Sequence, residues 1–397
     1  MSGFGQLSNA SMSVEQVFSS RFGGLPQTTA SAPGRINLIG EHVDYNRGLV
    51  LPFAIAQRTS VAGRMRPDLR VSVWSDWTNE RVDWDDIRQL DPSRSAPGWS
   101  RYVAGAVAQF VRRGNLHHGL DLAIDTSIPV GAGLSSSASL TAAITTLLRD
   151  MTSCELDGWE AARWCQATEH EFAGVPCGLM DPLVSLLGRA GKLLKIDFDD
   201  QSLEWIPLEL GDCRLVAIHS GVQHTLAGGE YAQRRNECQA AARELRVSSL
   251  REIEVERLPQ LAPLLPDILY SRVRHVVTEI DRVRQAESCC RQHDWERLGK
   301  LLTVSHQSLA DLYEVSCYEI DQLVELLLEE AEVLGARMTG GGFGGCVIAL
   351  LGNSRWQAAI TRVCDRYQQR TGCTATAWQT DPSDGAWAGQ NTPQVVQ

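Results

Sequence analysis

Residues 32–52 read Ala32-Pro33-Gly34-Arg35-Ile36-Asn37-Leu38-Ile39-Gly40-Glu41-His42-Val43-Asp44-Tyr45-Asn46-Arg47-Gly48-Leu49-Val50-Leu51-Pro52. Polar side chains that can do chemistry crowd into ten positions of this stretch: Arg35, Asn37, Glu41, His42 and Asp44. A strand in which apolar and polar residues alternate can bury the apolar side chains and turn the polar ones toward a cleft. Donors and acceptors at this density could read the hydroxyl groups of a sugar. The stretch alone also allows a second interpretation, a charged surface turn.

The composition is that of an ordinary globular protein and excludes several classes of partner. The 397 residues, 43% of them apolar, suffice for two domains or one large one. A formal net charge of −11 disfavours nucleic acid or an anionic membrane as the main partner, since both need a basic face, but it allows a local basic pocket for phosphate. The eleven cysteines form no C-x-x-C pair and are odd in number, which predicts reduced thiols in a cytoplasmic protein. We find no secretory signal and no apolar run long enough to span a bilayer.

Hydrophobic periodicity predicts strands and helices that do not alternate regularly. We expect mainly strands over 28–130, interrupted by a helix at 102–112, and further strands at 192–218, 346–351 and 373–378. We expect the remaining helices at 136–151, 157–172, 230–245, 270–291 and 319–333. In the helix at 270–291, Val273, Val276, Val277, Ile280 and Val283 share one face, and His275 beside them should be structural or solvated. Without regular βαβ units, the pattern predicts an α+β fold. The first dozen residues and those after Ala388 should be loose ends.

A glycine- and serine-rich stretch, Pro129-Val130-Gly131-Ala132-Gly133-Leu134-Ser135-Ser136-Ser137-Ala138-Ser139, follows a predicted strand and opens a predicted helix. Glycines let backbone N–H groups converge, serines supply caps and hydroxyls, and the helix N-terminus adds partial positive charge. The loop therefore suits the phosphates of a nucleotide, although an ordinary helix start has the same composition. The chain has neither the Walker A pattern nor the motifs of protein kinases.

A second glycine cluster lies at residues 338–346 and reads Met338-Thr339-Gly340-Gly341-Gly342-Phe343-Gly344-Gly345-Cys346. It formally satisfies G-x-G-x-x-G, but a dinucleotide site requires a helix to follow. The apolar run after it reads as a short strand. We therefore predict a loop that approaches a ligand closely and exclude a Rossmann site.

These three motifs resemble, in order and spacing, the signature motifs of the GHMP small-molecule kinases, and residues 35–52 resemble the galactokinase signature. Further stretches at 169–181, 224–231, 234–238 and 311–317 also resemble galactokinases, so the likeness covers nearly the whole chain. The resemblance implies a two-domain α+β architecture of the GHMP-kinase type, with the active site in the cleft between the domains. Residues 1–200 would form the N-terminal domain and residues 201–397 the C-terminal one. The Gly-rich loop 340–345 would belong to the second domain, and the last residues could pack back on the first.

The resemblance also implies a role for each candidate residue. Asp181 would stand beside the anomeric hydroxyl of the sugar as base or orienting group, with Arg35 between that hydroxyl and the γ-phosphate of ATP. The implied substrate-binding residues are Arg35, Glu41, His42, Asp44, Gly178, Asp181 and Tyr231. The implied nucleotide-binding residues are Ser75, Trp99, Gly131, Ala132, Gly133, Leu134, Ser135, Ser136 and Ser137. Ser137 and Glu169 would hold Mg²⁺, which needs few protein ligands because it keeps several waters.

One position departs from the family pattern, because Pro182 stands where galactokinases usually carry Gln. An Asp followed by Pro is also a common helix start, so Asp181 could be a plain N-cap. A helix N-terminus and Arg35 would both favour the ionised carboxylate of Asp181. This environment favours an orienting or late proton-accepting role over that of a strong base.

The function implied by the resemblance is ATP-dependent phosphorylation of α-D-galactose to α-D-galactose 1-phosphate and ADP, in a Leloir-type pathway. Two alternatives stay open: another sugar-1-kinase of the same group, for example for N-acetylgalactosamine, and a non-catalytic sensor of galactose and ATP. The presence of Arg35, Ser137, Glu169 and Asp181 favours an enzyme. We expect small-molecule partners, ATP and Mg²⁺ as cofactors, and a cytoplasmic monomer or weak homo-oligomer.

Overall fold

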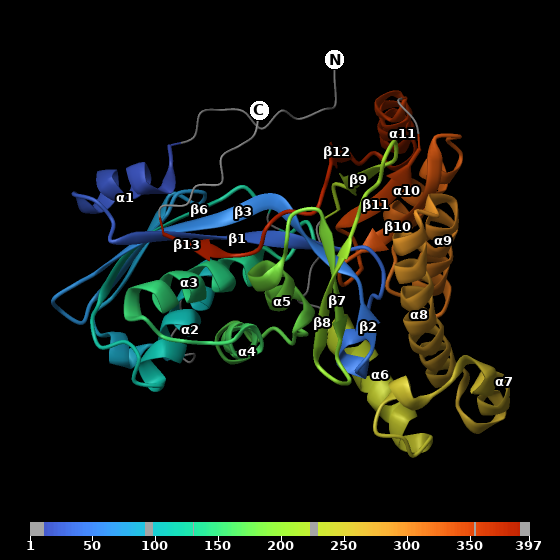
Figure 1. Cartoon of the computed structure of the whole chain (residues 1–397), viewed down its shortest axis with the longest axis horizontal. Coiled ribbons are helices and arrows are strands. Elements are labelled where there is room, and N and C mark those ends of the chain that lie inside the picture. The colour runs from blue at the N-terminus through green and yellow to red at the C-terminus, as the bar shows by residue number, and fades with distance from the viewer. Residues whose placement is uncertain (1–11, 92–97, 130, 223–228, 353–354, 390–397) are drawn as a thin grey trace.

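The computed structural model describes residues 12–91, 98–129, 131–222, 229–352 and 355–389 (Figure 1). Val130 of the glycine- and serine-rich loop lies outside these ranges. Three further stretches singled out above also lie outside them, either wholly or in part. They are the N-terminal arm up to residue 11, residues 224–228 of the segment that resembles a sugar-contacting one, and the tail from residue 390 onward.

Strands and helices are mixed along the chain, which confirms the predicted α+β class. The strands are β1 (Thr28–Asn37), β2 (Leu49–Val50), β3 (Pro52–Met65), β4 (Val71–Ser75), β5 (Glu80–Trp84), β6 (Leu120–Thr126), β7 (Lys192–Asp197), β8 (Ser202–Pro207), β9 (Arg214–His219), β10 (Val333–Thr339), β11 (Cys346–Leu351), β12 (Thr376–Gln379) and β13 (Trp387–Ala388). The helices are α1 (Val14–Phe22), α2 (Gly98–Arg112), α3 (Ser136–Thr152), α4 (Gly158–Thr168), α5 (Met180–Leu187), α6 (Glu230–Glu244), α7 (Leu258–Leu261), α8 (Asp267–Gln292), α9 (Trp295–Asp311), α10 (Tyr318–Leu328) and α11 (Trp356–Thr371). A π-helical turn, Glu169–Ala173, follows α4 directly.

The N-terminal half is built around a six-stranded sheet of order β13-β1-β3-β6-β4-β5, in which only the β4–β6 pair is parallel. Helix α1 lies on one face of this sheet, and α2, α3 and α4 lie on the other (Figure 1). Strand β1 is covered from both sides, and every residue after Thr28 is buried. This burial explains why apolar and polar residues do not alternate in the stretch before Arg35, as they would in a strand with one solvated face.

The C-terminal half contains a four-stranded sheet of order β10-β11-β9-β12, against which α9 and α10 pack. The five apolar residues of α8 named above are buried, as their spacing predicted, and His275 is buried among them. The helix expected over 319–333 is too long, because α10 ends at Leu328 and Val333 already pairs with Leu351 in the sheet. Strand β11 follows the 340–345 loop, so the prediction of a strand there is confirmed and the Rossmann interpretation stays excluded.

The chain returns to its first sheet at its C-terminal end. Strand β13 pairs with β1, where Ala30 faces Ala388 and Ser31 faces Trp387. The Arg58 side chain donates to the carbonyl oxygens of Asp384 and Gly385 at 2.7 and 2.6 Å and so fastens the returning segment. The domain boundary expected at residue 200 falls in the turn between β7 and β8.

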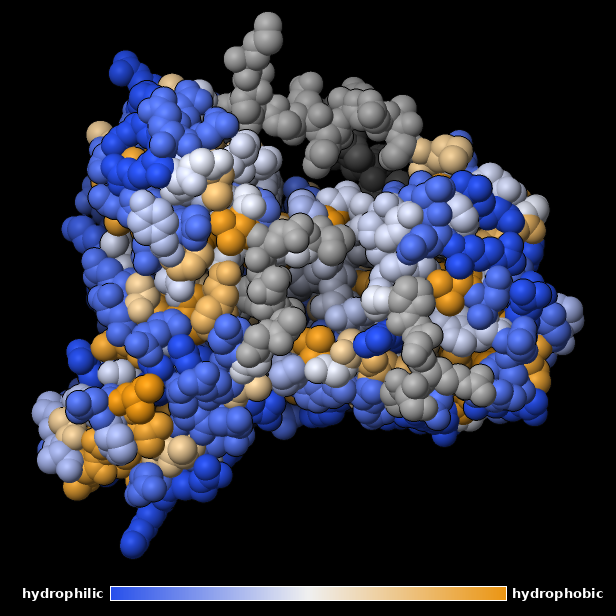
Figure 2. All heavy atoms as spheres, turned by 180° about the vertical axis from the view of Figure 1, so that it is seen from behind, coloured by the Kyte–Doolittle hydropathy of each residue, from blue (hydrophilic) through white to orange (hydrophobic). Residues whose placement is uncertain are grey.

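The back of the molecule is mostly hydrophilic, with apolar side chains gathered at the end that carries α6 and α7 (Figure 2). Leu264, which follows α7, and Ile268, in the first turn of α8, are 64% and 48% exposed. Among the residues that the structure describes, no helix has the length and apolar character to cross a bilayer. All eleven cysteines are free, as expected for reduced thiols.

Candidate active site

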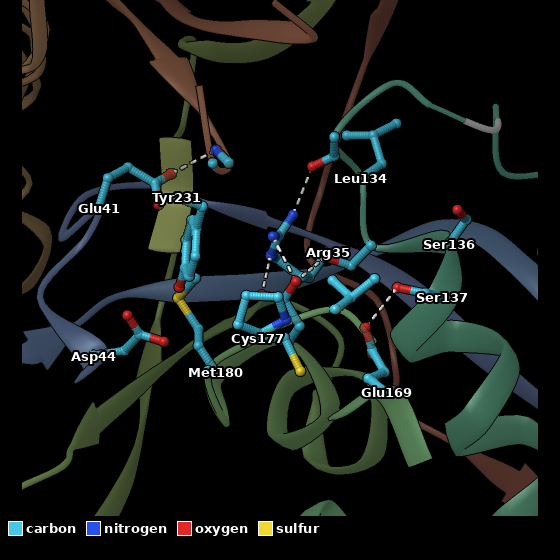
Figure 3. A pocket seen from close by; sticks show the side chains of 18 of the residues that line it. Arg35, Glu41, Asp44, Leu134, Ser136, Ser137, Glu169, Cys177, Met180 and Tyr231 are labelled. Carbon is cyan, nitrogen blue, oxygen red and sulfur yellow. Dashed lines mark hydrogen bonds and ion pairs between the residues drawn. The ribbon is translucent and has the colours of Figure 1, made fainter. Parts of the chain in front are cut away.

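A cavity of about 220 Å³ lies where the stretch 35–44, the loop 131–137 and the loop 340–345 meet. The candidate residues that line it are Arg35, Glu41, His42, Asp44, Gly131, Gly133, Leu134, Ser135, Ser136, Ser137, Glu169, Gly178, Asp181 and Tyr231. Figure 3 shows Glu41, Asp44 and Tyr231 on one side of the cavity, Ser136, Ser137 and Glu169 on the other, and Arg35 between them. The structure thus brings together residues from distant parts of the chain. We call the first group, together with His42 and Gly178, the sugar wall. The second group, together with Gly131, Gly133, Leu134 and Ser135 of the loop before it, is the phosphate wall.

Arg35 and Asp181 form a bidentate ion pair in the middle of the cavity. Arg35 Nε and Nη2 each donate to one carboxylate oxygen of Asp181 at 2.7 Å, and Nη1 donates to the Gly133 carbonyl at 2.7 Å. Burial opposes the charge of Arg35, but Asp181 and Glu41 outweigh it and raise the pKa of the guanidinium above its usual value. Arg35 is therefore a fixed cation, and planar pairing of this kind also fixes the orientation of the carboxylate.

Asp181 is not the N-cap that its sequence context allows. Leu179 occupies that position, and Asp181 and Pro182 lie inside the first turn of α5. The Asp181 carboxylate accepts hydrogen bonds from Arg35 and from the Ser135 hydroxyl. Because both partners come from cavity-lining segments, they hold the carboxylate at the cavity, where its side chain is 25% exposed.

The phosphate wall is made chiefly of backbone. Ser135 occupies the N-cap position of α3 with φ of 59°, but its side chain makes no capping hydrogen bond. Its hydroxyl is used by Asp181 instead. The loop also lies against the second glycine cluster, because a Cβ on Gly340, where φ is +93°, would come within 3.0 Å of the Gly133 carbonyl oxygen. The prediction was that this cluster approaches a ligand closely; in the structure it also packs against the loop 131–137.

Glu169 and Ser137 face each other at the edge of the phosphate wall, and the Ser137 hydroxyl donates to Glu169 Oε2 at 3.2 Å. Burial, followed by the charge of Asp181, raises the pKa of the Glu169 carboxyl to about 8. A buried carboxyl of this kind gains from a nearby cation. No group of three metal-ligating side chains occurs in the described ranges. A cation held here would therefore keep most of its water ligands, as Mg²⁺ does, and the pair fits that ion.

The sugar wall is made of side chains that are already held in place. Glu41 Oε1 accepts hydrogen bonds from the Gly340 N–H at 2.7 Å and the Thr339 hydroxyl at 3.2 Å, and it lies 3.5 Å from Arg337 Nη2. Arg337 is fully buried and also donates to the carbonyls of Asn37 and Leu38. The C-terminal half therefore fixes the position of the wall residues.

Asp44 depends on a glycine next to it. A Cβ added to Gly178 would lie 1.6 Å from Asp44 Oδ2, so any larger residue there would displace the carboxylate. Burial and then the charge of Asp181 raise the pKa of Asp44 to about 7. An acid in this state exchanges its proton near neutral pH and can both donate to and accept from a hydroxyl.

The remaining candidates lie apart from this cavity. Trp99 lines an adjoining pocket of about 180 Å³. Three residues line both this pocket and the cavity: Tyr102, Ser136 and Ser137. Ser75 and Ala132 line neither, because both are fully buried; the Ser75 hydroxyl accepts hydrogen bonds from Thr78. The sequence assigned no role to several lining residues, among them Trp77, Tyr102, Cys177 and Met180. Cys177 and Met180 lie within the stretch 169–181 that it singled out, whereas Trp77 and Tyr102 stand in no motif.

Three family models match the chain. Residues 16–65 match the galactokinase galactose-binding signature, residues 101–189 the N-terminal domain of GHMP kinases, and residues 286–369 the C-terminal domain of GHMP kinases. The first and second of these matches contain the sugar motif and the phosphate loop.

Curated relatives and solved structures agree with these matches. The galactokinases of Bos taurus and Homo sapiens are 42% and 41% identical to this chain, over 94% of it and 95% of each relative. The crystal structure of Lactococcus lactis galactokinase complexed with galactose superposes with a TM-score of 0.90 at 32% identity, over 94% of this chain and 98% of that one. A mevalonate kinase structure, at 18% identity and a TM-score of 0.64, shares the fold. The chain therefore belongs to the galactokinase family of GHMP kinases.

Proposed function

We propose that this enzyme transfers the γ-phosphoryl group of ATP to the anomeric hydroxyl of α-D-galactose, giving α-D-galactose 1-phosphate and ADP. The observation that carries the proposal is the convergence of the sugar wall and the phosphate wall on one cavity, with Arg35 and Asp181 where they meet. The match to galactokinases over 94% of the chain supports galactose over another sugar.

Asp181 and Arg35 would act at the reacting centre. The anomeric oxygen attacks the γ-phosphorus, the bond to the bridging oxygen breaks, and ADP leaves with that electron pair. Asp181 orients the sugar hydroxyl and accepts its proton late in the transfer, because its ion pair with Arg35 holds the carboxylate in a fixed orientation. Arg35, a fixed cation, stabilises the negative charge that spreads over the transferring group.

The two walls would bind the two substrates. We assign the sugar hydroxyls to Glu41, His42, Asp44, Tyr231 and the Gly178 backbone. We assign the phosphates of ATP to the loop that contains Gly131, Ala132, Gly133, Leu134, Ser135, Ser136 and Ser137. The adjoining pocket with Trp99 is the place we assign to the adenine, with Ser75 nearby in the family pattern. A wall of backbone suits phosphate oxygens, which are chemically alike, whereas different sugar hydroxyls require placed side chains.

Ser137 and Glu169 would hold a Mg²⁺ ion that accompanies ATP. When bound, the ion supplies charge neutralisation for the phosphate oxygens. Glu169, whose pKa is raised by burial and by Asp181, would lose its proton as the cation arrives.

We further propose the two domains 1–200 and 201–397, since the N- and C-terminal GHMP models match on either side of that boundary. The net charge of −11 supports small molecules, rather than nucleic acid or a membrane, as the partners. A cytoplasmic monomer or weak homo-oligomer agrees with the free cysteines.

The experiment that tests the function is a phosphorus-NMR assay of the purified protein with ATP, Mg²⁺ and a panel of free hexoses. We expect a new anomeric phosphate resonance with galactose, none with glucose, and none when Asp181→Ala replaces the wild type. Turnover with N-acetylgalactosamine alone would change the assigned substrate and leave the proposed phosphoryl transfer unchanged. Binding of galactose and ATP without turnover would overturn the assignment in favour of a sensor.

A further inference from the structure

A line of hydrogen-bonding side chains runs behind the sugar wall and ends at His42. His42 Nδ1 lies 2.9 Å from the Tyr45 hydroxyl oxygen, and that oxygen lies 2.8 Å from the Tyr313 hydroxyl. Cys238 Sγ lies 3.0 Å from the Tyr313 hydroxyl. His42 lines the cavity, whereas Tyr313 and Cys238 are buried behind it. None of these three supporting side chains has a role in the proposed reaction.

The geometry gives this line a single direction. His42 Nε2 lies 3.2 Å from the Gly341 carbonyl oxygen, which can only accept, so Nε2 carries the proton. Burial lowers the pKa of His42 to about 3, so the ring is neutral and Nδ1 offers a lone pair. Tyr45 must then donate to Nδ1 and accept from Tyr313, which in turn accepts from the Cys238 thiol.

Packing holds the same line in place. The Tyr313 ring packs against the rings of both His42 and His275, with centroid distances of 4.9 and 4.4 Å. The Tyr313 carbonyl accepts a hydrogen bond from Arg234 Nε at 2.6 Å. Tyr313 belongs to the stretch 311–317, and Cys238 lies on α6, whose first turn also carries Tyr231. The line therefore joins three segments of the chain around the sugar wall.

We propose that Tyr45 and Tyr313 are positioning residues for the sugar, which hold His42 in the tautomer whose Nε2 carries the proton. His42 can then only donate at the cavity, by sharing that proton between the Gly341 carbonyl and a sugar hydroxyl. The hydroxyl that accepts it keeps its own proton to donate to a carboxylate of the wall. This inference rests on the proposed function, because galactose is taken as the ligand.

The test removes hydroxyl groups and keeps the rings. For Tyr45→Phe we expect the KM for galactose to rise roughly 5- to 30-fold, because the variant loses one buried hydrogen bond and leaves His42 Nδ1 without a donor. Tyr313→Phe should raise it less, since Tyr45 can still donate to Nδ1. The kcat and the KM for ATP should not change in either variant. With a panel of monodeoxygalactoses, the penalty should vanish for the one sugar that lacks the hydroxyl bound by His42.

A matched control and a rescue separate positioning from simple stability. Tyr367 is also fully buried, and its hydroxyl donates to the Ser220 carbonyl at 2.8 Å, far along the chain from the sugar wall. Tyr367→Phe should lower stability to a similar extent and leave the KM for galactose unchanged. Cys238→Ser retains a donor and should behave as wild type, whereas Cys238→Ala should resemble Tyr313→Phe.

A second readout does not depend on activity. The ¹⁵N shifts of the His42 ring in the ligand-free protein should report a protonated Nε2 and a bare Nδ1 in wild type, and a tautomer mixture in Tyr45→Phe. Unchanged shifts and an unchanged KM in Tyr45→Phe would overturn the inference, as would an equal rise of KM in Tyr367→Phe. If wild type fails to phosphorylate galactose, the proposed function fails, and the ring shifts still decide whether the tautomer is held.

Discussion

The two walls of the cavity are built on opposite principles. On the sugar wall, Glu41 and His42 are buried side chains, and each is hydrogen-bonded to a residue of the loop 340–345. On the phosphate wall, Ser136 and Ser137 are half-buried, and the loop before them is fastened through backbone carbonyls, such as that of Gly133 to Arg35. One wall is fixed by side chains from both halves of the chain, and the other is shaped by glycine and a helix N-terminus.

The difference matches the ligand that the proposed function assigns to each wall. Sugar hydroxyls differ only in position, so discrimination requires donors and acceptors held within a fraction of an ångström. Phosphate oxygens are alike and charged, so converging amides and a cation suffice. We therefore expect changes on the sugar wall to cost stability and specificity, and changes on the phosphate wall to cost rate or nucleotide binding. The predictions below test this division, beginning with the residue that both walls share.

Asp181 stands where the walls meet, so its loss should have the largest effect. Asp181→Asn keeps the shape but removes both the proton acceptor and the charge paired with Arg35. We expect kcat to fall by about 10³- to 10⁴-fold, at the upper end of the range for general-base groups. Initial rates of ADP release measure this loss, and calorimetry should still detect galactose binding. A fall of less than tenfold would show that Asp181 has only a structural role.

Arg337 tests the sugar wall from behind. It is fully buried, and it donates to two carbonyl oxygens and faces the Glu41 carboxylate. Arg337→Met leaves these acceptors without a partner, and removing one member of a buried pair costs about 3–5 kcal/mol. Urea unfolding of this variant and of Ser137→Ala, on the phosphate wall, gives the comparison. We expect Ser137→Ala to cost less than about 1 kcal/mol of unfolding free energy. Equal losses in the two variants would contradict the division between the walls.

The sequence predicted the parts of the site that are local. Residues 35–44 and 131–137 each form a continuous piece of wall, so their composition alone indicated their chemistry. Arg337 could not be found in this way, because it lies nearly 300 positions from Glu41 and meets it only in the folded chain. Trp77 and Tyr102 border the adjoining pocket but look like ordinary apolar residues of a strand end and a helix.

The errors have a similar cause. Asp181-Pro182 is a valid helix start on local grounds, yet Leu179 takes the cap because Arg35 and Ser135 hold the Asp181 carboxylate. The helix expected at 319–333 continued through residues that the sheet uses as β10. In both cases a tertiary contact overrode a local preference, and neighbouring residues in the sequence do not predict such contacts.

Arg35 tests the comparison further, because its guanidinium donates both to the Asp181 side chain and to the backbone of the phosphate loop at Gly133. Arg35→Lys keeps the positive charge but cannot pair with both Asp181 oxygens and the Gly133 carbonyl at once. We expect kcat to fall by roughly 10²- to 10³-fold, as when one transition-state donor is removed. Steady-state rates with either substrate varied will show whether the loss lies in kcat, as expected. A change confined to the KM for galactose would place Arg35 on the sugar wall instead.

Glu169 should give the smallest effect, and its pH dependence has a definite sign. Burial, then Asp181, raises its pKa to about 8, from an ordinary value of 4.5 that the unfolded chain should retain. Between these pH values the metal-free folded state binds more protons than the unfolded state, so its unfolding free energy must fall as pH rises.

From this carboxyl we expect a fall of about 1–3 kcal/mol between pH 5 and pH 9. This is less than the full difference between the two pKa values would give, because the folded protein relaxes and admits water as the carboxyl ionises. Glu169→Gln has no such charge and should become more stable than wild type above pH 8. Urea unfolding in EDTA over this range measures both curves. Adding Mg²⁺ at pH 9 should raise the stability of wild type and leave the variant unchanged, because a cation compensates only an ionised carboxylate. Parallel curves for the two proteins would mean that Glu169 is already compensated within the protein. The polar groups of the phosphate wall would then have partners within the protein, as those of the sugar wall do. The two walls would differ only in that one is held by backbone groups and the other by side chains.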